Sequence, residues 1–263
     1  MDTTLLEDPA LSAYEELAPF YDLYTAGYRH ETWLANIEAM AVEHGLRGNR
    51  LLDVGCGTGK SFLPLLQRGY EVVACDLSPS MVEAARHAVT PPLTAEIVVA
   101  DMRALPRLGR FDLATCLDDA LNYVLSDAEL DAAFEGIARN LRPGGLFAFD
   151  LNTLGTYRRY FARDMISEAE DTVFCWRGDG DPEPAPGTRS SARIEIFARD
   201  SGGWQRSTTT HVQRHHPPAL VRRLLDQNGF DLLLVHGQID ATRIDSHADD
   251  EHHKKLLHLA RKR

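Results

Sequence analysis

One acidic residue and three evenly spaced glycines stand in the segment "RLLDVGCGTGKS", and together they could hold a ligand against bare backbone. These residues are Asp53, Gly55, Gly57 and Gly59. A phosphate-binding loop that ends in Gly-Lys-Ser would need a glycine where this chain has Val54. A dinucleotide fingerprint GxGxxG that starts at Gly55 would need its third glycine where the chain has Lys60. A carboxylate before a glycine turn instead suits a ligand with a cationic group and a flat remainder. Asp53 would orient the turn and hold the cation, directly or through water.

Two later acids fit the same ligand. Asp76 ends the apolar run "YEVVACD", where a carboxylate can accept both hydroxyls of a ribose. It is free for that role because Ser78 is the better N-cap of the helix that follows. Asp101 in "VVADM" could accept a hydrogen bond from an exocyclic amine, with Met102 packing on an adenine ring. A ligand with an ammonium, a ribose and an adenine but no phosphate is S-adenosylmethionine.

With these residues in place, the chain resembles the class I S-adenosylmethionine-dependent methyltransferases. Five motifs carry the resemblance in order, namely "LLDVGCGTGK", "ACDLSPSM", "VVADM", "FDLATC" and "LRPGGLFAFD". Within that family, "CLDDALNYV" followed by "FDLNT" is similar to the branch that methylates amino sugars, lincosamide-type antibiotics and other metabolites. Enzymes that methylate the amines of nucleic-acid bases carry Asn/Asp-Pro-Pro-aromatic where this chain has Leu117-Asp118-Asp119-Ala120. The resemblance therefore implies a small-molecule acceptor rather than a base.

The resemblance implies a cofactor site under an N-terminal helical lid, with Tyr21 near the methionine end, Trp33 in the same pocket and Leu117 against the sulfonium. The expected cofactor-binding residues are Tyr21, Trp33, Asp53, Gly55, Gly57, Gly59, Asp76, Leu77, Met81, Asp101, Met102 and Leu117. The expected acceptor-binding residues are Tyr14, Tyr24, Asp118, Asn122, Asp150 and Asn152. The candidate catalytic residues are Tyr21, Asp119 and His215. For several of them a structural role is an open alternative: core packing for the tyrosines, helix capping for the two acids after Leu117, and a buried anchor for Asn122.

These residues need elements that bring them together. Between about residues 50 and 150, short apolar runs alternate with helical stretches such as "KSFLPLLQRG" and "SPSMVEAARHA", which predicts parallel strands with crossover helices. Ligands of such sheets bind at the carboxyl ends of the strands. The resemblance implies a doubly wound, mostly parallel seven-stranded sheet of the Rossmann-like methyltransferase type. We expect a helical lid over 1–47, a core over 48–164 and 216–263, and a small antiparallel β insert over 165–215.

Composition narrows the function classes. The 263 residues carry a formal net charge of -11, which disfavours binding along nucleic acid. The four cysteines are far apart, and the acidic start lacks the positive charge of a signal peptide, which together favour a reducing, cytoplasmic compartment. We expect neither membrane insertion nor a metal, and we interpret the histidine-rich "DSHADDEHHKK" as a solvated connector. A homo-oligomer is compatible with the sequence.

Three functions stay open. The favoured one is methyl transfer from S-adenosylmethionine to a nitrogen of a natural-product acceptor, and antibiotic biosynthesis is one setting for it. The second is an O-methyltransferase, which needs a general base such as His211, His215 or a site carboxylate. His30 and His44 lie in the expected N-terminal helices and do not announce such a base. The third is a regulatory protein that binds the cofactor without catalysis.

Overall fold

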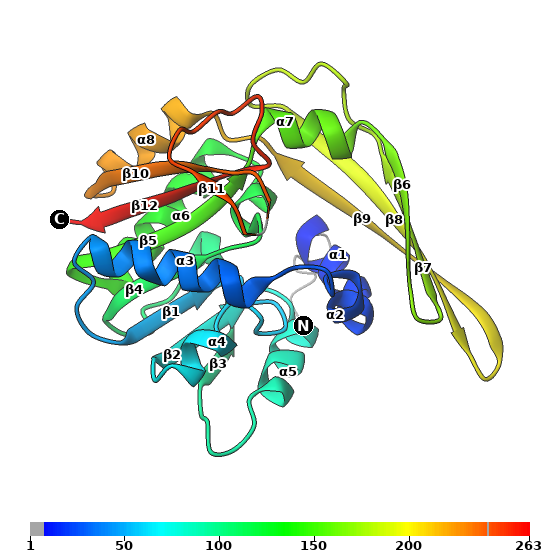
Figure 1. Ribbon diagram of the computed structural model, residues 1–263, viewed down its shortest axis with the longest axis horizontal. Helices are drawn as coiled ribbons and strands as arrows, with labels where there is room; N and C mark the ends of the chain where they lie inside the picture. The colour runs from blue at the N-terminus through cyan, green and yellow to red at the C-terminus, as the bar shows by residue number, and fades with distance from the viewer. Residues whose placement is uncertain (1–7, 241) are drawn as a thin grey trace.

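The computed structural model describes residues 8–240 and 242–263, so the first seven residues of the predicted lid lie outside the described residues. Figure 1 shows a central sheet with helices against its faces and a second, extended sheet at its side. The short helices α1 (Pro9–Leu17) and α2 (Tyr21–Tyr24) lie between the two sheets, beside the carboxyl ends of the core strands. This arrangement matches the predicted α/β class with an antiparallel insert.

The central sheet has the strand order β11-β10-β12-β5-β4-β1-β2-β3. β3, β2, β1, β4 and β5 are parallel, whereas β12 runs antiparallel to β5 and is followed by β10 and β11. The bounds are β1 Arg50–Val54, β2 Glu71–Asp76, β3 Glu96–Val99, β4 Phe111–Cys116, β5 Leu141–Asn152, β10 Phe230–Gln238, β11 Ile244–Asp245 and β12 Lys255–Lys262. The eighth strand beyond the predicted seven is the two-residue β11, which is too short for an alternation of side chains to reveal it.

The helices flank this sheet. They are α3 His30–Glu43, α4 Leu63–Gln67, α5 Pro79–Ala88, α6 Asp127–Asn140 and α8 Pro218–Gln227. The short α7 Leu154–Thr156 and the π-helical turn Tyr157–Phe161 lie instead beside the second sheet (Figure 1). Short 3-10 turns lie at Met102–Ala104 and Ala120–Tyr123. Ser78 caps α5 by accepting the Met81 N–H, as predicted. The predicted helix in "KSFLPLLQRG" is shorter than expected, because Lys60 and Ser61 belong to the turn and α4 begins only at Leu63.

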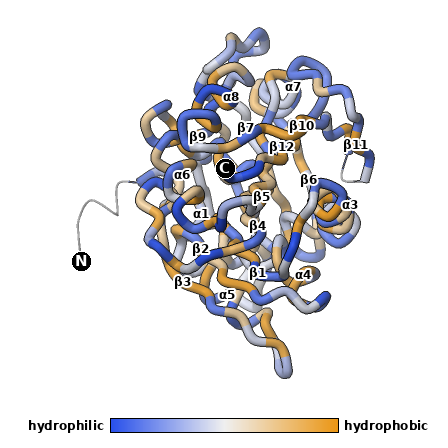
Figure 2. The backbone as a smooth tube through the Cα atoms, turned by 90° about the vertical axis from the view of Figure 1, so that its left-hand side faces the viewer, coloured by the Kyte–Doolittle hydropathy of each residue, from blue (hydrophilic) through white to orange (hydrophobic). Residues whose placement is uncertain are grey.

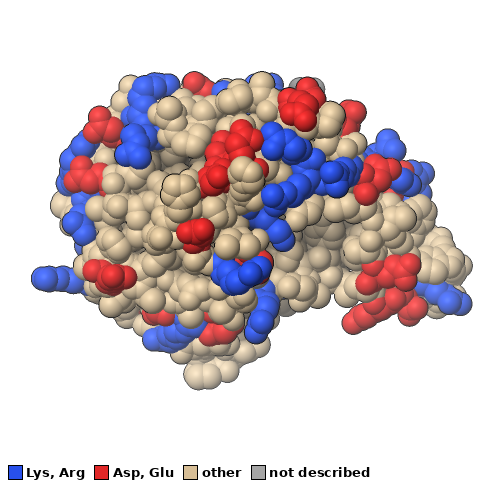
Figure 3. Space-filling model, turned by 45° about the horizontal axis from the view of Figure 1, so that its top comes forward, with Lys and Arg blue, Asp and Glu red and all other residues tan. Residues whose placement is uncertain are grey.

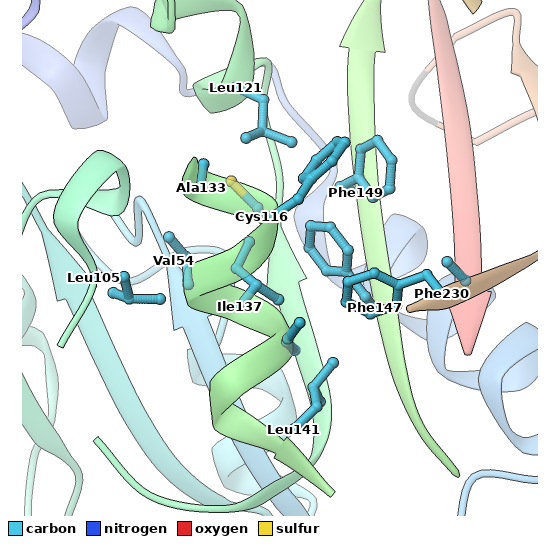
Figure 4. Close-up of a cluster of buried hydrophobic side chains, with 14 of the residues drawn as sticks. Val54, Leu105, Cys116, Leu121, Ala133, Ile137, Leu141, Phe147, Phe149 and Phe230 are labelled. Carbon is cyan, nitrogen blue, oxygen red and sulfur yellow. The ribbon is translucent and has the colours of Figure 1, made fainter. Parts of the chain in front are cut away.

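Apolar side chains fill both sides of the central sheet. On the side of α6, aromatic rings from β5 and β10 pack together, and Phe147 and Phe149 stack with centroids 4.5 Å apart (Figure 4). The other side packs against α3, whose Leu34 and Ile37 are fully buried. Apolar residues recur along strands and helices throughout the chain (Figure 2). Among the described residues, no helix has the length and apolar character needed to span a bilayer.

The second sheet has the order β6-β7-β8-β9, and every neighbouring pair is antiparallel. Its strands are β6 Asp164–Ala169, β7 Thr172–Gly178, β8 Arg189–Asp200 and β9 Gly203–Arg214. One face carries Phe174, Ile194 and Ile196. These residues pack against the N-terminal elements α1 Pro9–Leu17, the 3-10 turn Ala18–Phe20 and α2 Tyr21–Tyr24. The insert therefore supports the lid from behind.

Candidate active site

The glycine turn folds over the end of β1 in a conformation that side chains oppose. Gly55, Gly57 and Gly59 have φ of +73°, +52° and +96°, in the left-handed region. A Cβ on Gly55 would lie 2.9 Å from the Cβ of Ala120. The N–H groups of Gly55 and Cys56 donate to the Cys75 carbonyl on β2, at 2.8 and 3.0 Å. The turn therefore presents bare backbone to the cleft and is pinned to the neighbouring strand.

Asp53 lies beneath this turn. Its side chain is fully buried and accepts hydrogen bonds from the hydroxyls of Ser61, at 2.5 Å, and Thr115, at 2.6 Å. Burial raises the pKa of Asp53 to about 6, against the opposing effect of the two hydroxyls. Asp53 was predicted to orient the turn and to hold the ligand's cation. Its buried position fits the first role, and it could act on a ligand only through an intervening group.

The raised pKa has a consequence for stability. Because the folded state binds the Asp53 proton more tightly than the unfolded chain, the free energy of unfolding falls as pH rises from about 4 to about 6. We expect Asp53→Asn to remove this part of the dependence, about 3 kcal/mol, since the amide can still bond both hydroxyls. Urea unfolding at intervals from pH 4 to 7 measures it. Asp231→Asn, at an exposed carboxylate on β10, is the control; equal slopes in all three proteins would contradict the prediction.

Asp76 connects the turn to the next strand. Its carboxylate accepts the N–H of Gly57 at 2.8 Å and the N–H of Ser78 at 2.9 Å, and burial raises its pKa. A carboxylate oxygen can accept more than one hydrogen bond, so Asp76 retains acceptor capacity toward the cleft. Asp101 lies farther along, where Arg103 donates to both of its oxygens at 2.7–3.0 Å.

Two adjoining cavities lie over these residues. The first, of about 80 Å³, is lined by the turn, Asp76, Leu117 and the lid residues Tyr14 and Tyr21, among others. The second, of about 40 Å³, is lined by Asp101 and Met102. Both cavities are lined by Gly55, Leu77, Met102, Ala120 and Tyr123, so they form one cleft. Cavities that hold benzene measure about 150 Å³, so a nucleoside-sized ligand requires movement of the lid.

The lid closes the cleft through polar contacts. Thr58 Oγ1 donates to Asp22 at 2.7 Å, and Lys60 Nζ donates to the Asp22 carbonyl at 3.0 Å. Glu15 accepts from the N–H and hydroxyl of Ser80 at 3.0 and 2.7 Å. Tyr21 packs over the glycine turn, where a Cβ on Gly57 would lie 3.6 Å from its ring.

Beyond Leu117 the backbone is strained around a buried carboxylate. Asp118 and Asp119 both have left-handed φ, +57° and +55°, which is uncommon for residues other than glycine. Their successive N–H groups donate to the two oxygens of Asp150, at 3.0 and 2.6 Å. Such a pair of N–H groups is an anion-binding nest. Asp150, predicted to bind the acceptor, is instead fully buried and holds this loop in shape.

Two residues that the sequence analysis did not assign to the site complete this cluster. Lys255, the first residue of β12, places Nζ 2.8 Å from Asp119 and 3.5 Å from both Asp118 and Asp150. His30, the first residue of α3, bonds Asp118 through Nε2 at 2.7 Å. Both residues come from segments distant in sequence from the acids, and no local spacing links them. The basic residue at the start of the last strand, Lys255, was the available sign in the sequence that a cation faces these acids.

Several residues that were predicted to bind the cofactor or acceptor, or to act in catalysis, do not line the cleft. Trp33 is buried in the core, with its ring 5.6 Å from Lys255 Nζ. Met81 is fully buried in α5, and Tyr24 packs against Phe174 of the insert with centroids 5.2 Å apart. Asp119 is engaged by Lys255 and by Gln213, which donates through Nε2 at 2.5 Å. These four side chains act through packing or position in this structure.

The amides and His215 are structural anchors here. Asn122 donates to the carbonyl of Arg214 at 2.9 Å and accepts the N–H of Asn152 at 2.9 Å. Asn152 in turn donates to Gln213 at 2.9 Å. His215 accepts from the Gly187 N–H through Nδ1 and bonds Asp250 through Nε2 at 3.0 Å. With both ring nitrogens engaged, His215 has none available for the catalytic role predicted for it.

The histidine-rich segment after β10 has a structural role that the sequence did not indicate. The His253 ring is buried under Gly237, where a Cβ would lie 2.3 Å from it. Among the described residues, no group of three or more His, Cys, Asp or Glu side chains is arranged to hold a metal ion.

The residues that line the cleft suit S-adenosylmethionine once the lid has moved. A bare glycine turn, a carboxylate at the end of β2 and a wall of Asp101 and Met102 follow one another along it. Asp76 would hold the ribose, Met102 would pack on the adenine, and Leu117 would lie near the sulfonium. Nothing in this arrangement requires a phosphate-binding group.

Known proteins with similar sequences are methyltransferases. Residues 51–145 match a family described as "Methyltransferase domain". A malonyl-[acyl-carrier protein] O-methyltransferase of Pseudescherichia vulneris is 30% identical over 185 residues, 64% of this chain and 68% of the relative. A dTDP-3-amino-3,6-dideoxy-alpha-D-glucopyranose N,N-dimethyltransferase of Streptomyces fradiae is 33% identical over 135 residues, 50% of this chain and 51% of the relative.

A solved methyltransferase structure has the same fold. The crystal structure of an S-adenosylmethionine-dependent methyltransferase from Clostridium acetobutylicum superposes with a TM-score of 0.80 at 22% identity, over 93% of this chain and 96% of the other. The predicted fold and cofactor are thereby confirmed, and the chain belongs to the class I S-adenosylmethionine-dependent methyltransferases.

Proposed function

We propose that this enzyme transfers the methyl group of S-adenosylmethionine to a nitrogen of a small-molecule acceptor, such as an amino sugar or a related amine-bearing metabolite. The observation that carries the proposal is the acidic and aromatic end of the cleft. Asp118 lines the cavity together with Tyr14, Tyr21 and Tyr123. Asp119 follows directly in the chain.

The charge of this end favours a cation. Asp118 is ionised, because Lys255 and His30 lower its pKa by more than burial raises it. Lys255 balances one of the two charges carried by Asp118 and Asp119. An ammonium group would therefore meet a net negative site, and tyrosine faces attract a cation by about 1 kcal/mol each.

The relatives are methyltransferases, and their names differ in the atom that accepts the methyl group. The Streptomyces fradiae relative is named for an amino sugar, and the Pseudescherichia vulneris relative is an O-methyltransferase. A hydroxyl acceptor is therefore the second candidate. The overall surface supports a small free acceptor rather than a polyanion, since the formal charge is -11 and both signs are interspersed on the face in Figure 3.

The reaction also requires alignment of the reactants and exclusion of water, and residues of this chain can meet both requirements. The cofactor supplies a methyl group on a cationic sulfonium. In-line transfer needs alignment and exclusion of water more than acid–base power. Leu117, 3% exposed, and Tyr21 line the cavity and would exclude water from it, while the lid contacts of Asp22 and Glu15 would hold the cleft closed.

A paired library tests the proposal. Each primary or secondary amine, amino sugars included, is matched with the alcohol that replaces its nitrogen, and methyl transfer from isotopically labelled cofactor is read by mass spectrometry. We expect label on nitrogen in amine members and none in their alcohol partners. Transfer confined to hydroxyls would establish the second candidate instead. Calorimetric binding of S-adenosylhomocysteine, measured beside the library, separates a wrong acceptor class from an inactive preparation.

A further inference from the structure

A histidine and an aspartate face each other at the acceptor end of the cleft. Nε2 of His30 lies 2.7 Å from Oδ2 of Asp118, and the two side chains are 9% and 18% exposed. Both residues line the same cavity as Tyr21 and Leu117. We propose that His30 is the proton acceptor of this enzyme and that Asp118 orients its ring. The inference rests on the proposed transfer to a small acceptor and holds for nitrogen or oxygen.

The pairing determines which nitrogen is basic. An ionised carboxylate accepts hydrogen bonds but donates none, so Nε2 of His30 carries the proton and donates it to Asp118. The lone pair of the neutral ring is then on Nδ1. The same logic, with a carboxylate holding one imidazole nitrogen so that the other can act, underlies general-base histidines on unrelated folds.

The local backbone fixes both partners. His30 opens α3 after Arg29, whose φ and ψ of -94° and 63° turn the chain into the helix. Asp118 is held in its left-handed conformation by the Asp150 carboxylate. Asp150 is thus a positioning residue, since it acts on His30 only through the shape of the loop.

Other ionisable groups near the cleft are less suited. His211 bonds the Tyr123 hydroxyl through Nδ1 at 2.8 Å, and burial lowers its pKa to about 4, which makes it a weak base. His215 has both nitrogens engaged, and Asp119 is bound by Lys255. Within 8–240 and 242–263, His30 is the histidine that lines the glycine-turn cavity.

Several ionisable side chains surround His30. Asp118 is in direct contact with it, and Lys255 lies 3.5 Å from the other oxygen of that carboxylate. Asp119 follows Asp118 in the chain, Tyr21 lines the same cavity, and the Tyr28 ring lies 5.9 Å from the imidazole. An imidazolium formed at His30 would face the Asp118 carboxylate at hydrogen-bond distance.

The proton and electron changes balance. An ammonium acceptor loses one proton to Nδ1 of His30, which frees the electron pair on its nitrogen. That pair forms the bond to the methyl carbon while the pair of the methyl–sulfur bond stays on sulfur. A hydroxyl acceptor loses its proton to the same nitrogen. The proton leaves His30 for solvent after product release.

His30→Gln tests the inference, since its amide can still donate to Asp118 but has no basic nitrogen. With an acceptor from the library, we expect single-turnover transfer at pH 7 to fall by about 10²–10⁴-fold and the rate to follow the acceptor's own ionisation. Affinity for S-adenosylhomocysteine should change less than threefold. His87→Gln, at an exposed histidine of α5, is the control and should leave both unchanged. A His30→Gln protein with the wild-type rate and pH profile overturns the inference while leaving the proposed function standing.

A second measurement needs no acceptor. Long-range nitrogen–proton NMR of the imidazoles in the whole protein should show neutral His30 with its proton on Nε2, and Asp118→Asn should reduce that preference. A proton on Nδ1 in the wild-type protein would leave no lone pair there and would overturn the inference. Transfer to hydroxyls alone, with a His30→Gln defect, would refute the nitrogen acceptor but retain His30 as the base.

Discussion

Lys255→Met is expected to lower the free energy of unfolding at pH 7.5 by about 3–5 kcal/mol, the cost of leaving buried charges without their partner. Lys255 Nζ lies within 3.5 Å of Asp118, Asp119 and Asp150. Its own pKa is raised well above the ordinary value, because attraction by these acids outweighs burial. Methionine is unbranched and only one heavy atom shorter than lysine, so the loss measures mainly the charge rather than a cavity.

The loss of unfolding free energy in Lys255→Met should become smaller as the pH falls. Burial and repulsion by the neighbouring acids raise the pKa of Asp150 to about 7 even with Lys255 present. A group with a raised acid pKa costs stability as pH rises from about 4 through that value. Without Lys255 the cost grows, so the difference between variant and wild type should shrink toward pH 5.

Chemical unfolding at pH 5, 6.5 and 8 provides the measurement. Lys254→Met is the matched control, since Lys254 Nζ lies over the Tyr160 ring at 5.8 Å and outside the acid cluster. It should cost less than about 1 kcal/mol, as for other partly exposed contacts. Equal losses for the two variants, or a Lys255→Met loss that does not vary with pH, would contradict this electrostatic account.

The parts of the site that follow one strand directly could be predicted from sequence. Gly55 and Asp76 stand at the ends of β1 and β2, and the parallel topology alone brings such ends to one edge. Local spacing is enough there, because the turn needs glycine for its φ and an acid at the end of a strand lies at that edge. The structure adds that Gly57 and Asp76 are joined by a hydrogen bond.

The acceptor end could not be predicted in the same way. His30 and Lys255 meet Asp118 from opposite ends of the chain, through α3 and β12. The left-handed conformation of Asp118 and Asp119 depends on the buried carboxylate of Asp150. Two consecutive aspartates in a sequence do not by themselves predict that conformation. Three aspartates in a sequence do not indicate which one faces a ligand and which one holds a loop.

Asp76→Ala is expected to weaken binding of S-adenosylmethionine and S-adenosylhomocysteine by about 100-fold or more. A hydrogen bond to a charged group contributes about 1.5–3 kcal/mol, and every 1.4 kcal/mol is a factor of ten. Two ribose hydroxyls would lose their acceptor, and the Gly57 N–H would lose the carboxylate that fixes the turn. Isothermal calorimetry with the demethylated product avoids turnover during the measurement.

Loss of a buried carboxylate also affects folding, and a second aspartate separates the two effects. Asp112, 6% exposed, accepts the Arg50 N–H at 3.0 Å and the Arg142 guanidinium at 2.6 Å at the opposite edge of the same sheet. Asp112→Ala should lower the unfolding free energy but bind cofactor as the wild type does. If both variants lost affinity in proportion to their stability, Asp76 would be a structural residue. A loss of affinity specific to Asp76→Ala assigns the ribose contact to this carboxylate, because the two carboxylates share a sheet but only Asp76 lines the cleft.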